Sequence, residues 1–171
     1  MTPPIPLQPG DVLLYSKSDF FGWVTSFRTF SPVVHVEIYE GGGLSLASRN
    51  GIGVNRYPLR LAQLAAVLRP RQKVDTDAMR TWFEQKYNPA SGKGVRGRPY
   101  GWLDLLRFYN VKVNTDGWIC SQFVAQALRA GGLSVFAQDY YCGTIDPGDY
   151  FLPAALEWAW VRPDVYKELT T

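Results

Sequence analysis

Apolar residues of this chain occur in short runs that glycine, proline and polar residues separate. The run over 11–16 follows a Pro-Gly pair and predicts a buried strand. The β-branched and aromatic run over 33–39 predicts another strand. Glycines 41–43 then lead into the run over 44–48. These two runs predict a β-hairpin, because glycine readily adopts the positive φ angles of a tight turn.

The middle of the chain gives weaker patterns. The segment 51–54 predicts a turn and a short strand, and residues 59–66 have a helical composition. Residues 66–69 predict a strand that Pro70 closes, because a residue before proline favours extended backbone. The aromatic segment 20–30 predicts a short helix or a loop crossing.

Helical spacing appears in the second half of the chain. Asp75 is a suitable N-cap for a helix in which Met79, Trp82 and Phe83 share one face. The apolar positions of 100–109 also predict an amphipathic helix.

A further helix is predicted over 118–130. Asp116-Gly117 precede it as an N-terminal signal, and Gly131-Gly132 stop it. A last amphipathic segment covers 153–160. The glycine-rich basic segment 89–99 favours a solvated loop over a phosphate cradle, because its SGKG fragment lacks the spacing of a P-loop.

Composition and charge narrow the class of protein. At 171 residues, with 46% apolar and 19% charged residues, residues 1–171 are expected to form a single α+β domain. A net charge of +3 is too small to indicate a nucleic-acid partner. No apolar run approaches the roughly 18 residues of a membrane span.

The N-terminus lacks the features of a signal peptide, so we expect a cytoplasmic protein, or one exported by a route that needs no signal. A bacterial or a phage source and the oligomeric state are left open by the sequence.

Cysteine and histidine are scarce. The chain has two cysteines and one histidine, and it has no CxxC pair. This set predicts no metal site and no cofactor, and a disulfide between Cys120 and Cys142 is not expected without a secretory signal. Cys142 has no helix start before it and is interpreted as structural or incidental.

Cys120 is the candidate nucleophile because it lies in the first turn of the predicted helix. Unpaired N–H groups and the helix dipole favour an anion there, and the thiolate is the reactive form of cysteine. The same N–H groups suit the oxyanion of an acyl-transfer reaction. His35 is the candidate base, since it interrupts an apolar strand in which it has no packing advantage. A cysteine nucleophile paired with a histidine base is the arrangement of cysteine hydrolases.

Several short motifs resemble the circularly permuted branch of the NlpC-type papain-like hydrolases, which includes YiiX-like amidases and lecithin:retinol acyltransferase-like enzymes. The motifs are PGDVL at 9–13, VHVEIY at 34–39, ASRNGIGV at 47–54, YGW at 100–102 and CSQFV at 120–124. The histidine strand precedes the cysteine helix here, as in the permuted order. The resemblance implies an antiparallel sheet packed against a central helix that carries the nucleophile.

A third residue is expected to orient the imidazole. If Tyr39 pairs with Leu44 across the turn, Ser48 lies opposite His35, and cross-strand Cβ atoms of such a pair are about 5 Å apart. Glu37 is the alternative on the same face, although the i+2 spacing of about 6.5–7 Å is long for a contact.

Other candidates depend on the pairing of the hairpin. A register slip of one residue would place Ala47 opposite His35, and Asn50 or a backbone carbonyl would then serve. Tyr15 and Tyr100 are candidates for a hydroxyl near the thiolate, but core packing is the favoured role for both.

The resemblance implies a cysteine amidase or peptidase that acts on peptidoglycan peptides or related amides through a thioester. A lipid acyltransferase or thioesterase is an alternative, although the chain has no C-terminal anchor and no long apolar tail. A third hypothesis is a binding or host-interaction module on a degenerate papain-like fold.

Overall fold

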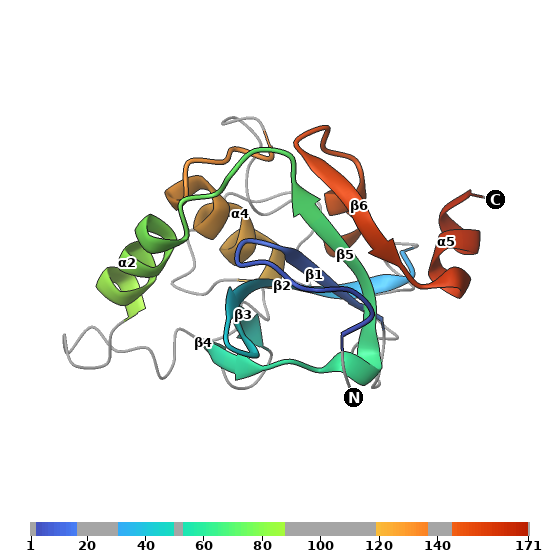
Figure 1. Cartoon of the computed structure of the whole chain (residues 1–171), viewed down its shortest axis with the longest axis horizontal. Coiled ribbons are helices and arrows are strands. Elements are labelled where there is room, and N and C mark those ends of the chain that lie inside the picture. The colour runs from blue at the N-terminus through green and yellow to red at the C-terminus, as the bar shows by residue number, and fades with distance from the viewer. Residues whose placement is uncertain (1–2, 17–30, 50–52, 88–118, 137–144, 171) are drawn as a thin grey trace, which may run out of the picture.

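A six-stranded antiparallel sheet with the order β4-β3-β2-β1-β5-β6 forms the framework of the protein (Figure 1). The computed structural model describes residues 3–16, 31–49, 53–87, 119–136 and 145–170. The strands are β1 (Val12–Ser16), β2 (Val33–Gly41), β3 (Leu44–Arg49), β4 (Gly53–Pro58), β5 (Leu64–Pro70) and β6 (Leu156–Val161). The elements predicted over 20–30, 89–99 and 100–109 lie outside the described residues.

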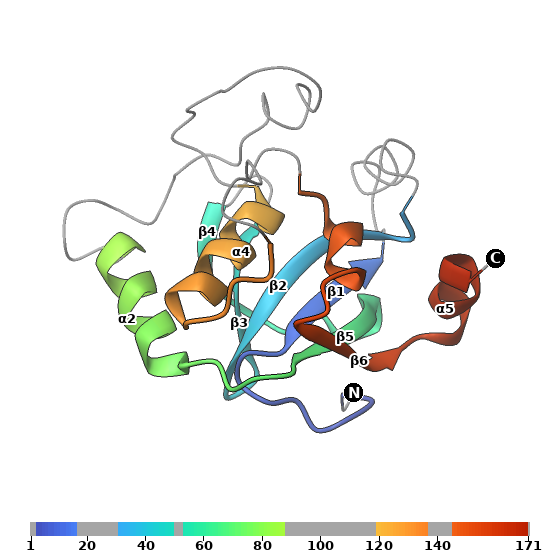
Figure 2. The same cartoon turned by 90° about the horizontal axis from the view of Figure 1, so that it is seen from above.

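Helices accompany the sheet without alternating regularly with its strands, so the fold is α+β, as predicted. The helices of the described ranges are α2 (Thr76–Tyr87), α4 (Cys120–Ala130) and α5 (Pro163–Thr170), with 3₁₀ turns η1 (Leu61–Gln63) and η4 (Pro147–Phe151). Helix α4 packs on β2 and β3, and α2 packs beside α4 (Figure 2). Helix α5 follows β6 at the edge of the sheet.

The alternation of side chains along the central strands determines which residues face α4. Val12 and Leu14 of β1 belong to the core under α4, whereas Leu13 and Tyr15 pack in a second apolar cluster on the opposite face. Both faces of β1 are therefore buried, which explains its uninterrupted apolar run. Along β2, Val36 and Ile38 share the α4 core.

The hairpin between β2 and β3 forms as predicted, but its predicted register was wrong. Tyr39 pairs with Ser45, not with Leu44, and Leu44 pairs with Gly41. The ladder is irregular between Tyr39 and Gly41, so one extra β2 residue is accommodated there. Gly41 has a φ of 114°, which favours glycine at this bulge. Ser48 is therefore shifted by one residue from the place opposite His35, and on the other side of β3 it pairs with Val54 of β4.

Helix α4 begins later than predicted. Cys120 is its first residue and Ile119 is the N-cap, while the predicted N-terminal signal at Asp116 lies outside the described residues. The predicted stop at the glycine pair is confirmed. Gly132 has a φ of 85°, and the Leu133 N–H donates to the Leu128 carbonyl across the end of the helix.

Two other predictions need correction. Residues 59–66 were expected to be helical, but the chain makes only the η1 turn and enters β5 at Leu64. Leu and Ala in this segment suit a helix, yet β5 lies between β1 and β6, and its first five residues are buried in the sheet. The amphipathic segment 153–160 contains most of strand β6, and α5 was not predicted.

Candidate active site

The structure brings Cys120 and His35 together at the N-terminal end of α4. Cys120 is the first residue of the helix and is buried, with 3% of its surface exposed. His35 stands near the start of β2, and 13% of its side chain is exposed. The imidazole lies beside the thiol, and each group shifts the pKa of the other. The two residues predicted as nucleophile and base therefore lie in direct contact.

The backbone of β2 and α4 also contributes to the thiol's surroundings. The β2–β3 ladder extends from Gly41 back to Ile38, whereas β1 follows β2 as far as Val33. Beyond the β2–β3 ladder, the Val36 N–H hydrogen-bonds to the Cys120 sulfur. The Ser121 N–H, in the first turn of α4, is a second backbone donor to this sulfur. His35 and the N–H groups of Val36 and Ser121 thus all lower the pKa of the Cys120 thiol.

Glu37 occupies the other side of the imidazole. Its Oε1 atom lies 3.1 Å from His35 Nε2, which leaves Nδ1 as the ring nitrogen for the thiol. Glu37 follows His35 by two residues, so both side chains are on the same face of β2. The backbone spacing suggested too long a gap, but the glutamate side chain is long enough to reach back to the far ring nitrogen.

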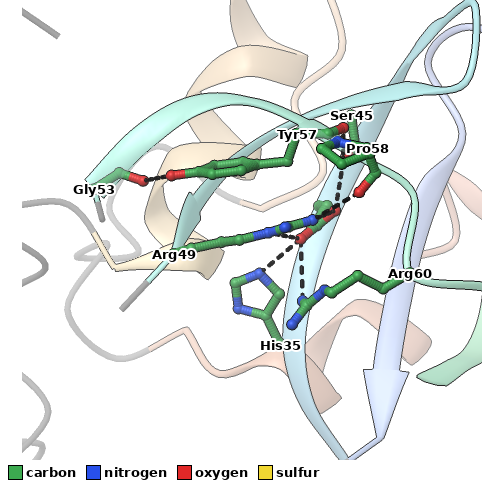
Figure 3. Close-up of polar contacts among 8 residues, drawn as sticks. His35, Ser45, Arg49, Gly53, Tyr57, Pro58 and Arg60 are labelled. Carbon is green, nitrogen blue, oxygen red and sulfur yellow. Dashed lines mark hydrogen bonds and ion pairs between the residues drawn. The ribbon is translucent and has the colours of Figure 1, made fainter. Parts of the chain in front are cut away.

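The Glu37 carboxylate is fully buried within a set of donors (Figure 3). Arg49 binds both oxygens, with Nε 2.8 Å from Oε1 and Nη2 3.2 Å from Oε2. Arg60 Nη2 donates to Oε1 over 3.1 Å, and the Ser45 hydroxyl donates to Oε2 over 2.5 Å. The carboxylate that contacts the imidazole is therefore fixed in one orientation.

The charges of Cys120 and His35 stabilise each other. Burial alone lowers the pKa of His35, but the negative charges and hydrogen bonds of Cys120 and Glu37 outweigh it and raise the pKa to about 9. Burial raises the pKa of the Cys120 thiol, but the adjacent imidazolium and the N–H groups of Val36 and Ser121 outweigh burial and lower it. This arrangement favours a thiolate–imidazolium pair near neutral pH.

Glu37 and Tyr15 are shifted in opposite directions. Burial raises the pKa of Glu37, but His35 and Arg49 outweigh it, so its pKa falls well below the usual range and the carboxylate remains charged. Burial and the charge of Glu37 raise the pKa of Tyr15 above its usual range, so its phenol remains protonated. The Tyr15 and His35 rings are 6.2 Å apart.

Ser48, the first choice for the third residue, points to the other face of the sheet. It alternates along β3 with Arg49, whose side chain binds Glu37, and it shares the α4-facing side with Leu46. It is fully buried there. Ala47 is also fully buried in β3, whereas Asn50, Tyr100 and Cys142 lie outside the described residues.

The residues around Glu37 were missed by the sequence analysis. Ser45 and Arg49 are four residues apart on β3, with Ala47 between them on the face of Glu37, and this period-2 pattern was available in the sequence once the register was known. Arg60 follows the end of β4 and carries no comparable pattern, since only the tertiary fold brings it to β2.

Within the described ranges, no group of three or more histidine, cysteine or acidic side chains is arranged to hold a metal ion. In the same part of the chain, no helix has the length and apolar character needed to cross a membrane.

The geometry suits nucleophilic attack by sulfur with proton transfer through His35. No protein-family model matches this chain, and no curated protein matches it.

Proposed function

We propose that this protein is a cysteine-dependent amidase or peptidase of the circularly permuted NlpC-type papain-like class. The observation that carries the proposal is the continuous chain of contacts from the Cys120 thiol through the His35 ring to Glu37. Nucleophile, base and orienting carboxylate form one series, which is the arrangement that acyl transfer through sulfur requires.

The reaction has two steps. The Cys120 thiolate attacks the amide carbonyl carbon, the C–N bond breaks, and the leaving amine takes the proton from the His35 imidazolium. A thioester remains on sulfur. His35, now neutral, takes a proton from water as the water oxygen attacks the thioester carbon. The C–S bond then breaks, and the carboxylic acid leaves while the thiolate–imidazolium pair is restored.

Glu37 has the role of a positioning residue in this scheme. It holds the imidazole by Nε2 and stabilises its positive charge, while Arg49 and Ser45 prevent the carboxylate from turning away. Because the pKa of Glu37 is held low, the proton stays on the imidazole and is delivered to the leaving amine.

The order of elements supports the permuted class. The histidine strand β2 precedes the cysteine helix α4, and α4 packs against the antiparallel sheet at β2 and β3. Peptidoglycan peptides and related amides are the substrates that this class suggests. The hypothesis of a binding module rested on the weakness of Ser48 as an orienting residue. The contact between Glu37 and His35 provides a stronger one and therefore favours catalysis.

Alkylation tests the nucleophile directly. Iodoacetamide should modify Cys120 at least about tenfold faster than Cys142 near neutral pH, because only an activated thiol is substantially ionised there. Mass spectrometry of the two cysteine peptides gives both rates in one sample. Equally slow modification of both cysteines would overturn the proposal.

Turnover tests the reaction class. Peptidoglycan fragments, simple peptide amides and short-chain thioesters are compared as substrates, with Cys120→Ala as the control that should lose hydrolysis. Amide cleavage that persists in Cys120→Ala contradicts a sulfur nucleophile, and cleavage of thioesters alone would favour the acyltransferase or thioesterase alternative.

A further inference from the structure

Positive charge exceeds negative charge in the hydrogen-bonded cluster around Glu37. With the thiolate and imidazolium formed, the two anions Cys120 and Glu37 face three cations, His35, Arg49 and Arg60. A surplus charge in partly buried surroundings is poorly stabilised unless a counter-charge approaches it. Among the described residues, the cluster therefore carries one positive charge that no acidic side chain balances.

Arg60 is the cation that Glu37 needs least. Arg49 already binds both carboxylate oxygens, and only 14% of its side chain is exposed. Arg60 gives Glu37 a single contact through Nη2, and 32% of its side chain is exposed. Its Nε atom is buried and has no hydrogen-bond partner among the described residues. Arg60 therefore has one unused donor, the buried Nε, and about a third of its side chain is open to solvent.

Tyr15 holds this arginine beside the imidazole and adds a second unsatisfied group. The Arg60 guanidinium lies 4.7 Å from the centre of the Tyr15 ring, a cation–π distance. The Tyr15 hydroxyl is buried, with 1% of the residue exposed. The Arg60 backbone N–H acts on its oxygen as a donor, but the hydroxyl proton has no acceptor in the described part of the chain. Such an orphaned hydroxyl costs stability and is satisfied when an acceptor arrives.

We propose that Arg60, supported by Tyr15, binds a carboxylate of the substrate, so that the preferred substrates are amides or peptides with a free carboxylate close to the scissile bond. This inference rests on the proposed function and specifies its substrate class. The shared Oε1 atom of Glu37 links Arg60 to His35 Nε2, with 3.1 Å on each side. The anion is thus recognised on the Glu37 side of His35, across the imidazole from the thiol.

Two alkylating reagents test the charge preference without any known substrate. Iodoacetate carries a carboxylate and iodoacetamide is its neutral counterpart, and each forms an S–C bond with Cys120 as iodide leaves. The iodoacetate-to-iodoacetamide rate ratio should fall about five- to tenfold in Arg60→Gln and should be retained in Arg60→Lys. The wild-type ratio should also decrease with added salt.

Matched variants separate a specific site from general charge. Arg71→Gln removes the same charge at an exposed position that pairs with Glu157, and it should leave the ratio unchanged within about twofold. Tyr15→Phe keeps the ring under Arg60 but lacks the hydroxyl, so the ratio should fall without loss of folded protein. Thermal unfolding of each variant checks that the fold is intact.

The outcomes are distinguishable. If the iodoacetate-to-iodoacetamide rate ratio is equal in wild type, Arg60→Gln and Arg71→Gln, the proposal of a carboxylate site is overturned, whatever the absolute rates are. Rapid alkylation of Cys120 in the same experiment would still support its proposed role as nucleophile. Slow alkylation of Cys120 by both reagents would overturn that role. Peptide substrates with a free carboxylate should be cleaved with a higher kcat/KM than the same peptides with a carboxamide in its place. Arg60→Gln should abolish this difference by lowering kcat/KM for the carboxylate peptides alone.

Discussion

His35 Nε2 and Glu37 Oε1 lie 3.1 Å apart on the same strand, and Arg49 Nε lies 2.8 Å from the same carboxylate oxygen. The imidazole is therefore held by an anion that is itself held by an arginine. Because Arg49 binds both carboxylate oxygens, Glu37 remains ionised despite complete burial and stabilises a positive charge on the ring. This relationship makes the protonation state of His35 sensitive to each member of the cluster.

The single histidine of the chain makes this sensitivity measurable. An NMR titration of the ring protons reports His35 alone and should give a pKa of about 9. In Cys120→Ala the pKa should fall, because the thiolate contributes most among the groups that raise it. An unchanged pKa in Cys120→Ala would show that the two side chains do not interact as an ion pair.

The direction of the pKa shift of His35 determines how the protonation of this residue affects the stability of the folded state. Its pKa is raised from 6.5 to about 9 on folding, so the folded state binds this proton more tightly. The contribution of His35 to the free energy of unfolding is complete below about pH 6.5 and is lost as the pH rises through about 9. Activity should decline over the same alkaline range, because the leaving amine then receives no proton from the imidazole. A rate that continues to rise above pH 9 would contradict this role.

Replacing Glu37 by glutamine should lower the pKa of His35 and reduce kcat/KM by about a hundredfold. The amide cannot balance Arg49 and Arg60, so the free energy of unfolding should also fall by about 3 kcal/mol. Glu157→Gln is the matched control, since Glu157 is 46% exposed and pairs with Arg71 at the surface. The NMR titration and chemical denaturation of both variants give the two effects separately.

Local sequence patterns predicted the elements that carry the reacting groups. The apolar run around His35 and the following glycines required a hairpin, and the helix had to stop at Gly131-Gly132. Cys120 was correctly expected in the first turn of that helix. Each of these features depends on neighbouring residues, so the sequence contained the information needed.

The third residue could not be chosen in the same way because it depended on a single bulge. The irregularity between Tyr39 and Gly41 shifts β3 by one residue, which turns Ser48 to the α4 side and Arg49 to the side of Glu37. The observed register places Leu46 opposite Ile38 in the core under α4, whereas the predicted register would have placed it opposite Glu37. Arg60 depends on the path of the chain after β4, which no local pattern determines.

The glycine pair at the end of α4 should respond unequally to alanine. A Cβ at Gly131 would lie 2.5 Å from Val74 Cγ1 and 3.1 Å from the Asp75 carbonyl, so Gly131→Ala should cost about 2 kcal/mol. Gly132 has open space around it but a φ of 85°, so Gly132→Ala should cost about 1 kcal/mol. Chemical denaturation measures both, and a smaller loss for Gly131→Ala would contradict the close contact with Val74.

Two buried serines of β3 provide the sharpest test of which face of the strand serves the imidazole. Ser45 and Ser48 are both fully buried, but only Ser45 lies on the Glu37 face, where its hydroxyl donates to Oε2. Ser45→Ala should destabilise the protein by about 2 kcal/mol, the value of a hydrogen bond to a charged group. It should also lower kcat/KM on a peptide amide about tenfold, because Glu37 is then less firmly oriented.

Ser48→Ala is the matched control for this substitution, since it removes an equally buried hydroxyl three residues further along the strand. We expect it to leave kcat/KM within about threefold of the wild type and the alkaline decline at the same pH. Both variants are compared with the wild type by pH profile and by chemical denaturation. If Ser48→Ala reduced activity more than Ser45→Ala did, the imidazole would depend on the α4-facing side of β3, and Glu37 would not be its orienting group.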